Sequence, residues 1–360
     1  MHLLSSDIDE VVASLPASFW GRFSGKRVLL TGGRGFLGRY FTEVFARVNQ
    51  SFLLANDCAP VELVVLDNFI SSGPFGEHAQ AAPHVAFLKH DVIKPFYPER
   101  PVDFVLHAAG IASPEHYLKF PEETAEVSAI GTKNMIQIAK DNPGCRLAFF
   151  SSSEIYGNPD KDHVPTAETY KGYVSCTGPR SAYDEGKRFG EMLVRKAFER
   201  HDVQAVSIRP FNFYGPSQQR TDGRVLPNFA ARWVDGQPLR VYGDGQQTRT
   251  FCYVTDGIRG CLQALVDGHA GEPYNVGNPN PEISMRDLAL TVGRITGQDV
   301  RFEKAEYPET YPADEPQRRC PDISKIRSHV GYEPKVALED GLRRFFGWAD
   351  RAFRDVRAAA

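Results

Sequence analysis

The stretch that decides the fold is Arg27-Val28-Leu29-Leu30-Thr31-Gly32-Gly33-Arg34-Gly35-Phe36-Leu37-Gly38. An apolar strand over residues 27–30 runs directly into a turn with glycines at 32, 35 and 38, and helical spacing of apolar residues follows over 36–48. Glycines allow a tight turn and let backbone N–H groups approach a pyrophosphate, while the helix N-terminus adds partial positive charge. This context predicts a dinucleotide-binding turn made by Gly32, Gly35, Phe36, Leu37 and Gly38.

Further apolar runs repeat the strand signal along the chain. They are followed in several places by helical segments, and they cover residues 63–66, 85–88, 104–106, 147–150 and 205–208. Strands that are apolar on both faces and alternate with helices are typical of a parallel sheet covered by helices. We therefore predict an α/β fold, a Rossmann-type doubly wound parallel sheet.

The residue composition divides the chain into three parts. Residues 1–25 read as a short helical extension, and 26–210 as the dinucleotide-binding domain. From 211 to 350 Gly, Pro, Gln and Asp become frequent, which favours a smaller substrate-binding lobe, with segments free to return to the first domain. Residues 49–61 are longer than a tight connection requires and are interpreted as an insertion.

Composition excludes several classes of protein. The formal net charge of -3 gives no electrostatic reason to expect a nucleic-acid partner. The six cysteines are scattered without metal-binding spacing, so we expect free thiols, no metal site and a reducing cytoplasm. The N-terminus lacks the features of a signal peptide, and no apolar run is long enough to predict a membrane span.

Asp67 ends the second strand, where its carboxylate can accept hydrogen bonds from ribose hydroxyls. A carboxylate there repels a 2′-phosphate, so the sequence favours NAD over NADP. Asn68 follows it. Asp91 and Val92 are expected to reach the adenine, and the backbone of Ala108, Ala109 and Gly110 is expected to pass beneath the cofactor.

Tyr183 and Lys187 lie four residues apart, and Ser181 with Asp184 predicts a capping box that begins a helix at this point. On a helix Tyr183 and Lys187 share one face. An ammonium group beside a phenol favours the phenolate, so we expect Lys187 to lower the pKa of Tyr183 and make it a base. This pair, the glycine turn and the run Ser151-Ser152-Ser153-Glu154 form a specific combination.

These motifs resemble those of the extended short-chain dehydrogenases/reductases that modify nucleotide sugars, and most closely those of the UDP-glucuronate decarboxylases. The resemblance runs from Lys26 to about Trp348. The matching stretches are His90-Asp91-Val92, Ala112-Ser113-Pro114, Ser153-Glu154-Ile155-Tyr156-Gly157, Gly178-Pro179-Arg180, Tyr183-Asp184-Glu185-Gly186-Lys187-Arg188, Asp222-Gly223-Arg224-Val225, Gln247-Thr248-Arg249, and Arg319 before Pro321-Asp322-Ile323.

The resemblance implies NAD as cofactor, a nucleotide sugar such as a UDP-linked hexuronate as substrate, and a homodimer. Tyr183 would be the base that assists oxidation of the sugar at C4, Lys187 would hold the nicotinamide ribose, and Ser152 would bind the 4-hydroxyl. By the same resemblance Ser153, Glu154 and Arg319 would surround C5 and its carboxylate. Positions that match the nucleotide site are Asn212, Arg224, Tyr242, Gln247, Arg249 and Arg319.

Other interpretations stay open at this stage. A related 4-epimerase, such as a UDP-glucuronate 4-epimerase, or a 4,6-dehydratase fits much of the pattern, although dehydratases typically carry Asp-Glu where this chain has Ser153-Glu154. Glu126 and Ser128 replace the lysine and asparagine usual in decarboxylases. A non-catalytic NAD-binding regulator is a more remote possibility. Plain structural roles are available for Arg249, Arg319, Glu154 and Tyr242, and packing roles for His90 and His107.

Overall fold

The computed structural model describes residues 3–72, 82–297, 302–305 and 316–358. Its centre is a seven-stranded sheet in the order β11-β6-β5-β4-β1-β2-β3, with every neighbouring pair parallel. The strands are β1 (Arg27–Thr31), β2 (Glu62–Asp67), β3 (Val85–Lys89), β4 (Phe104–His107), β5 (Arg146–Phe150), β6 (Gln204–Pro210) and β11 (Pro273–Val276). The predicted Rossmann-type fold is confirmed.

Helices cover both faces of this sheet because neighbouring strand residues point to opposite sides. Leu30 packs in the cluster with Phe41, whereas Leu29 packs in the cluster with Met135. One face carries α3 (Phe36–Val48) and α9 (Val254–Asp267); the other carries η4 (Val127–Gly131), α6 (Thr132–Asp141) and α7 (Ser181–His201). Between β4 and η4 the chain forms α4 (Pro114–Lys119) and α5 (Pro121–Glu126).

All six strands predicted from the sequence are present, and the helix over 36–48 has the predicted bounds. The seventh strand, β11, was not predicted; it pairs with β6 although more than sixty residues separate them. β3 is an edge strand with Leu88 exposed, so the expectation of burial on both faces is wrong there.

The N-terminal extension is helical, as predicted, with α1 (Ser5–Ser14) and α2 (Ala17–Gly21). It contributes Ile8, Val11 and Trp20 to the larger core cluster. The segment after α3 continues as η1 (Asn49–Leu53) and η2 (Leu54–Asn56). The Asn49 side chain closes it by donating to the Val61 carbonyl at 2.9 Å and accepting from the Val61 N–H at 2.8 Å.

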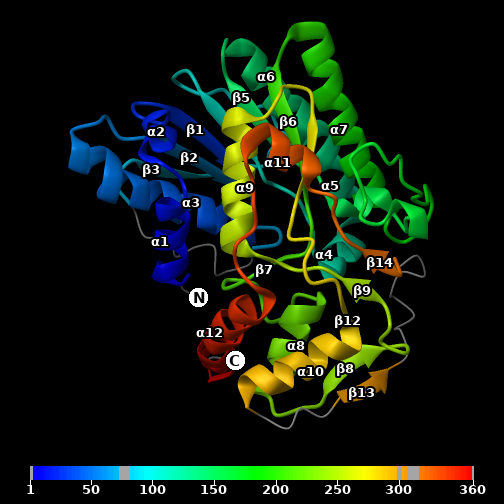
Figure 1. Ribbon diagram of the computed structural model, residues 1–360. Helices are drawn as coiled ribbons and strands as arrows, with labels where there is room; N and C mark the ends of the chain where they lie inside the picture. Colours follow the sequence, from blue (N-terminus) through cyan, green and yellow to red (C-terminus); the bar gives the residue numbers. More distant parts are fainter. Residues whose placement is uncertain (1–2, 73–81, 298–301, 306–315, 359–360) are drawn as a thin grey trace.

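A smaller lobe lies at one end of the sheet, where Figure 1 shows α8, α10, β8 and β13 grouped at the bottom of the view. The chain enters it after β6 and returns to the sheet at β11, so the two lobes are not consecutive in sequence. Its elements are β7 (Phe213–Tyr214), α8 (Val225–Val234), β8 (Leu239–Tyr242), β9 (Thr248–Arg249), β10 (Cys252–Tyr253), β12 (Ile283–Ser284), α10 (Met285–Thr296), β13 (Phe302–Ala305), β14 (Arg318–Arg319) and α12 (Leu338–Ala358). The helix α11 (Ser324–Val330) instead lies against α9 and β11 of the sheet.

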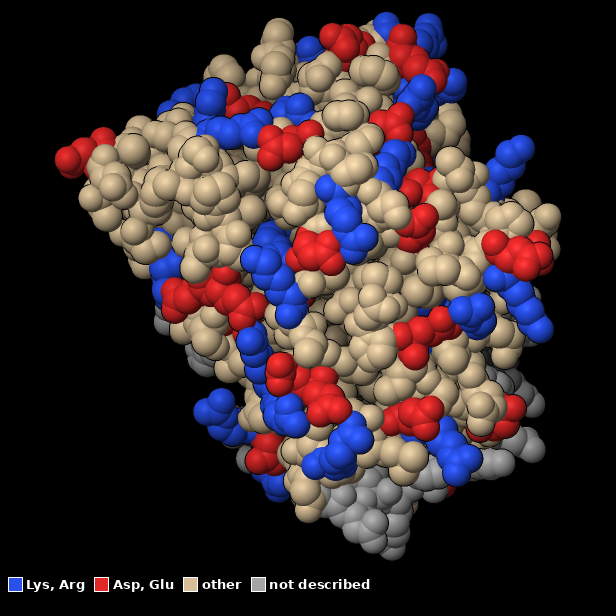
Figure 2. Space-filling model, in the orientation of Figure 1, with Lys and Arg blue, Asp and Glu red and all other residues tan. Residues whose placement is uncertain are grey.

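The surface carries both charges in alternation. On the face shown in Figure 2, Lys and Arg side chains are interspersed with Asp and Glu rather than gathered by sign. Among the described helices, none combines the length and apolar character that a bilayer crossing requires.

Candidate active site

The glycine turn joins β1 to α3 and packs closely against the chain that leaves β4. Gly32 has a φ of 69°, and a Cβ atom there would lie 2.7 Å from the backbone of Ala109. A Cβ atom at Gly38 would lie 2.2 Å from the Gly32 carbonyl oxygen. Glycine is therefore required at both positions. Gly35 is the N-cap of α3, so the unpaired N–H groups of the first helical turn border the cavity above the turn.

Asp67 closes one side of this cavity at the carboxyl end of β2. Its carboxylate accepts hydrogen bonds from the N–H groups of Arg34 and Phe69, both at 2.8 Å, and from the Ser72 hydroxyl at 3.3 Å. Asn68 donates to the carboxylate of Asp91 at 3.2 Å. Asp67 thereby holds the glycine turn and the β2 edge together while its charge stays at the cavity wall.

These residues fit NAD. The glycine turn and the N-terminus of α3 provide N–H groups for a pyrophosphate, and Asp67 provides an acceptor for ribose hydroxyls. Asp91, Val92, Ala108, Ala109 and Gly110 line the same cavity. The carboxylate of Asp67 disfavours the additional phosphate of NADP.

Lys187 lies on α7 beneath this cofactor site and is 3% exposed. Its Nζ donates to the Phe150 carbonyl at 2.7 Å, and a Cβ atom at Gly110 would lie 3.0 Å from Nζ. Burial lowers the pKa of Lys187 to about 8. The ammonium group is thus held directly under the Ala108–Gly110 segment.

Tyr183 lies one turn before Lys187 on the same face of α7, as predicted. Burial raises the pKa of Tyr183, and the hydrogen bond with Ser152 and the charges of Arg224 and Arg180 oppose this rise. The expectation that Lys187 brings this pKa below its ordinary value is wrong for this arrangement, because the Lys187 ammonium is directed to the Phe150 carbonyl, 5.8 Å from the centre of the Tyr183 ring.

The predicted capping box at the start of α7 is also wrong. The helix begins at Ser181 with Arg180 as its N-cap, and no side chain caps it. Asp184 instead lies 3.7 Å from the Arg180 guanidinium. The Asp184 carboxylate, which would have completed the box, pairs instead with Arg180, and Arg180 pairs in turn with Glu154.

Glu154 and Arg319 form the charged wall of the cavity. Arg319 makes a bidentate ion pair with Glu154, with Nη2 and Oε2 2.8 Å apart, and Arg180 forms a second ion pair with the same carboxylate. Ser152 is the N-cap of η5 (Ser153–Tyr156), and its hydroxyl accepts from the Glu154 N–H at 3.2 Å. The turn after β5 therefore presents Ser152, Ser153 and Glu154 in one short segment.

The smaller lobe supplies the residues expected to bind the nucleotide. Arg224 pairs with Asp222, with Nε 2.9 Å from Oδ1. Asn212 donates to the Thr250 carbonyl at 2.8 Å, and Gln247 donates to the Tyr242 carbonyl at 3.2 Å. Arg249 donates to the carbonyl of Thr248 at 2.8 Å. All of these predicted residues, like every site residue predicted above, line one continuous cavity.

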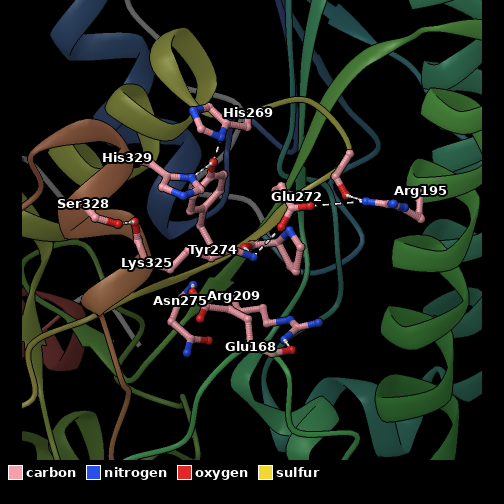
Figure 3. A network of polar contacts seen from close by, with 12 residues as sticks. Glu168, Arg195, Arg209, His269, Glu272, Tyr274, Asn275, Lys325, Ser328 and His329 are labelled. Carbon is pink, nitrogen blue, oxygen red and sulfur yellow. Dashed lines mark hydrogen bonds and ion pairs between the residues drawn. The ribbon is translucent and has the colours of Figure 1, made fainter.

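The sequence did not identify Asn275 of β11, which is fully buried behind the charged wall. Its side chain accepts from the Tyr156 hydroxyl at 2.7 Å and donates to the carbonyls of Thr166 and Asp322 at 2.8 and 2.9 Å. Figure 3 shows it beside Arg209, which donates to the same Tyr156 hydroxyl at 2.6 Å. One amide thus links the segment that carries Glu154 to the segment that carries Arg319.

The two positions that depart from the decarboxylase pattern, Glu126 and Ser128, lie where α5 continues into η4. Glu126 lines the cavity, and so does Glu123 one turn before it on α5. Ser128 is buried, and its hydroxyl has no hydrogen-bond partner among the described residues. The α5 side of the cavity is therefore acidic, opposite in charge to the arginines of the other walls.

His107 has a structural role. It is fully buried with Nδ1 2.8 Å from the Thr31 hydroxyl, and burial lowers its pKa to about 3, so the ring is neutral. His90 lines the cavity edge, where its Nε2 lies 3.1 Å from the Lys94 carbonyl. Over the described part of the chain, His, Cys, Asp and Glu side chains form no cluster of three or more suited to a metal ion.

Comparison with known proteins gives concordant results. Residues 28–277 match the model of the NAD dependent epimerase/dehydratase family. A UDP-glucuronic acid decarboxylase of Xenopus tropicalis is 37% identical over 330 residues, 91% of this chain and 73% of the relative. One from Arabidopsis thaliana is 38% identical over 89% of this chain and 87% of its own. An epimerase structure from Methanothermobacter thermautotrophicus superposes with a TM-score of 0.79 at 24% identity, over 96% of this chain and 98% of that one.

Proposed function

This chain belongs to the NAD-dependent epimerase/dehydratase family, and on that premise we propose that it is a UDP-glucuronate decarboxylase that forms UDP-xylose. The relatives at 37% and 38% identity support this substrate and reaction. The observation that carries the proposal is a single cavity in which Tyr183 and Ser152 stand beside the cofactor turn and Arg319 stands beside Glu154. An oxidation site and a carboxylate-binding site are therefore adjacent.

The first step is oxidation at C4 of the sugar. When bound on the glycine turn, NAD supplies the acceptor and later the donor of the hydride, and is recycled. The Ser152 hydroxyl is hydrogen-bonded to Tyr183, and in the complex it binds the 4-hydroxyl of the sugar next to this tyrosine. Tyr183 removes the hydroxyl proton, and the charges of Arg224 and Arg180 oppose the rise of its pKa caused by burial.

The second step is loss of carbon dioxide. A ketone at C4 makes the C5 carboxylate a β-keto acid, so the C5–carboxyl bond breaks and its electron pair delocalises into the carbonyl. Arg319 attracts and orients the carboxylate of the substrate through its positive charge, beside the Glu154 carboxylate with which it is already paired. C5 of the resulting enolate then takes up a proton that comes from solvent, and Ser153 and Glu154 take part in this protonation. Reduction of the C4 ketone completes the turnover.

A second candidate is a 4-epimerase for a neutral nucleotide sugar. The acidic wall formed by Glu123 and Glu126 favours it, since two carboxylates on α5 would repel a uronate placed against them. A 4,6-dehydratase is disfavoured because serine at position 153 is a poor proton donor. A non-catalytic NAD-binding regulator is disfavoured by the placement of Tyr183 and Lys187 in the cavity.

The test is product mass after incubation with UDP-glucuronate. A decarboxylase yields a nucleotide sugar lighter by one carbon dioxide, whereas a 4-epimerase yields a product of unchanged mass with inverted C4. A matched incubation with UDP-glucose examines the second candidate. Turnover of UDP-glucose alone, without any reaction of UDP-glucuronate, would replace the first proposal by the second.

We further propose that the protein is a cytoplasmic homodimer. Three of the exposed apolar residues, Ile130, Phe189 and Met192, lie on η4 and α7. These two elements pack against each other, and this surface suits a second copy of the chain. All six cysteines are free thiols, in keeping with a reducing compartment. Light scattering of the Phe189→Glu variant tests the surface: a monomer is expected, and an unchanged dimer would exclude it.

A further inference from the structure

Arg180 lines the cavity, and the reaction described above uses it only through its charge, which opposes the rise of the Tyr183 pKa. It is the N-cap residue of α7, three residues before Tyr183 and seven before Lys187. At this helical spacing Arg180, Tyr183 and Lys187 point to the same side. Arg180 as a whole is only 7% exposed, so the fold places a permanent charge next to the base.

Arg180 and Arg319 share one carboxylate. Arg180 Nη2 pairs with Oε2 of Glu154, the same oxygen that lies 2.8 Å from Arg319 Nη2. Asp184 stands behind Arg180 at 3.7 Å. The four side chains form a row of alternating charge, Asp184, Arg180, Glu154 and Arg319, with two positive and two negative members.

A uronate substrate adds a third carboxylate to this row. Arg319 must then bind the carboxylate of the sugar as well as that of Glu154, and two carboxylates close together in a buried site repel each other. Loss of a partner would leave Glu154 a half-buried charge with fewer partners, which is unfavourable. Arg180 provides a second partner, and Asp184 fixes the position of Arg180.

We propose that Arg180 is a positioning residue for decarboxylation, which keeps Glu154 in place on its own side of the cavity while Arg319 binds the carboxylate of the substrate. This inference rests on the proposed function, because only a uronate requires the arrangement. It assigns two neighbouring arginines to separate tasks, one toward the protein and one toward the substrate. Oxidation at C4 depends on neither task, although the charge of Arg180 near Tyr183 also favours it.

The experiment separates the two steps in one assay. Purified wild type, Arg180→Gln and Arg180→Lys are mixed with NAD and UDP-glucuronate carrying a labelled carboxyl carbon, and NADH absorbance and labelled carbon dioxide are recorded together. Arg195→Gln is the matched control, since Arg195 lies on the same helix but pairs with Glu199 and Glu272 away from the cavity. Melting temperature and NAD affinity are measured for every variant.

For Arg180→Gln we expect NADH formation to slow by only about threefold, through the lost charge near Tyr183, and carbon dioxide release to slow by about 100-fold, so that NADH accumulates. Arg180→Lys keeps the charge near Glu154, so its rate of carbon dioxide release is expected to lie between those of wild type and Arg180→Gln. If the glutamine variant does not fold, the lysine variant is used for the test. Equal slowing of both signals in the folded variants would overturn the inference. If wild type forms no carbon dioxide, the proposed function fails, and the inference with it.

Discussion

Arg319 and Glu154 are 165 residues apart in the chain, yet they form a bidentate ion pair on the wall of the cavity. Glu154 follows β5 of the large sheet, whereas Arg319 ends β14 in the smaller lobe. The smaller lobe therefore contributes a charge to the cavity wall that begins at the end of β5. This ion pair is the point at which both lobes meet in the proposed chemistry.

Arg319→Ala should slow carbon dioxide release by at least about 100-fold and change NAD affinity little, since the removed charge faces the carboxylate and not the glycine turn. Arg318→Ala is a matched control, because its neighbour Arg318 pairs with Glu282 instead, at 2.8 and 2.7 Å. Single-turnover kinetics and NAD titration provide the measurement. A loss confined to nucleotide affinity would reduce Arg319 to a phosphate-binding residue.

Asp67→Asn should shift cofactor preference toward NADP. The Asp67 carboxylate is the negative charge next to Arg34 and Arg39. Burial lowers the pKa of both arginines, and the charge of Asp67 opposes part of this decrease. Without it, both arginines become available to a 2′-phosphate, and we expect the ratio of NAD to NADP affinity to fall at least about tenfold. Calorimetric titration measures both affinities, with Asp57→Asn as control. An unchanged ratio would exclude Asp67 as the determinant.

Asn275→Asp should lower turnover more than it lowers NAD affinity. The substitution removes the amide donors to Thr166 and Asp322 and buries a carboxylate where no solvent reaches, so the segments of Glu154 and Arg319 lose their common anchor. We expect kcat to fall about 100-fold and the free energy of unfolding to fall by about 3 kcal/mol.

Asn142→Asp is the control for Asn275. The Asn142 amide also both accepts and donates: it accepts from the Val102 N–H and donates to the Ile138 carbonyl, at the opposite end of the sheet. It should lose stability with near-normal kcat per folded molecule. Equal kcat losses in both variants would show that Asn275 acts through general stability and not through the charged wall.

His107 should make the protein acid-sensitive. Its pKa is about 3 in the fold and near 6.5 when unfolded, so below pH 6.5 only the unfolded chain takes up the proton. Stability is therefore lost as pH falls, by about 2 kcal/mol from this group between pH 6.5 and 5. Urea unfolding of wild type and His107→Gln measures it. The variant should be less stable at pH 7 with a shallower acid slope; parallel slopes would contradict the assignment.

Much of the fold was predictable because local signals were strong. The glycine turn follows an apolar strand directly, and α3 has the predicted bounds. β11 was missed because its four residues give a weak pattern and its partner β6 is distant in sequence. Arg180 lies within one of the motifs quoted above, but its ion pair with Glu154 forms only in the tertiary structure, and no spacing of residues in the sequence predicts it.

The errors at α7 have the same origin. Ser181 and Asp184 match a capping pattern, but Arg180 pairs with Asp184 as well as Glu154, and no cap forms. Spacing placed Tyr183 and Lys187 correctly, whereas the pKa of Tyr183 depends on burial, which spacing does not report. The residues predicted from the sequence line one cavity, whereas the direction of the Tyr183 pKa shift follows from how the side chain is packed.

The central claim is that hydride leaves C4 of the sugar and returns to the same carbon, with Tyr183 as the base. It is tested most directly with UDP-glucuronate deuterated at C4, followed by mass spectrometry and NMR of the product. The account predicts UDP-xylose that retains deuterium at C4 and carries one solvent hydrogen at C5, with Tyr183→Phe slower by about 1000-fold or more at unchanged melting temperature. Loss of the deuterium to solvent, or near-normal turnover by Tyr183→Phe, would contradict it.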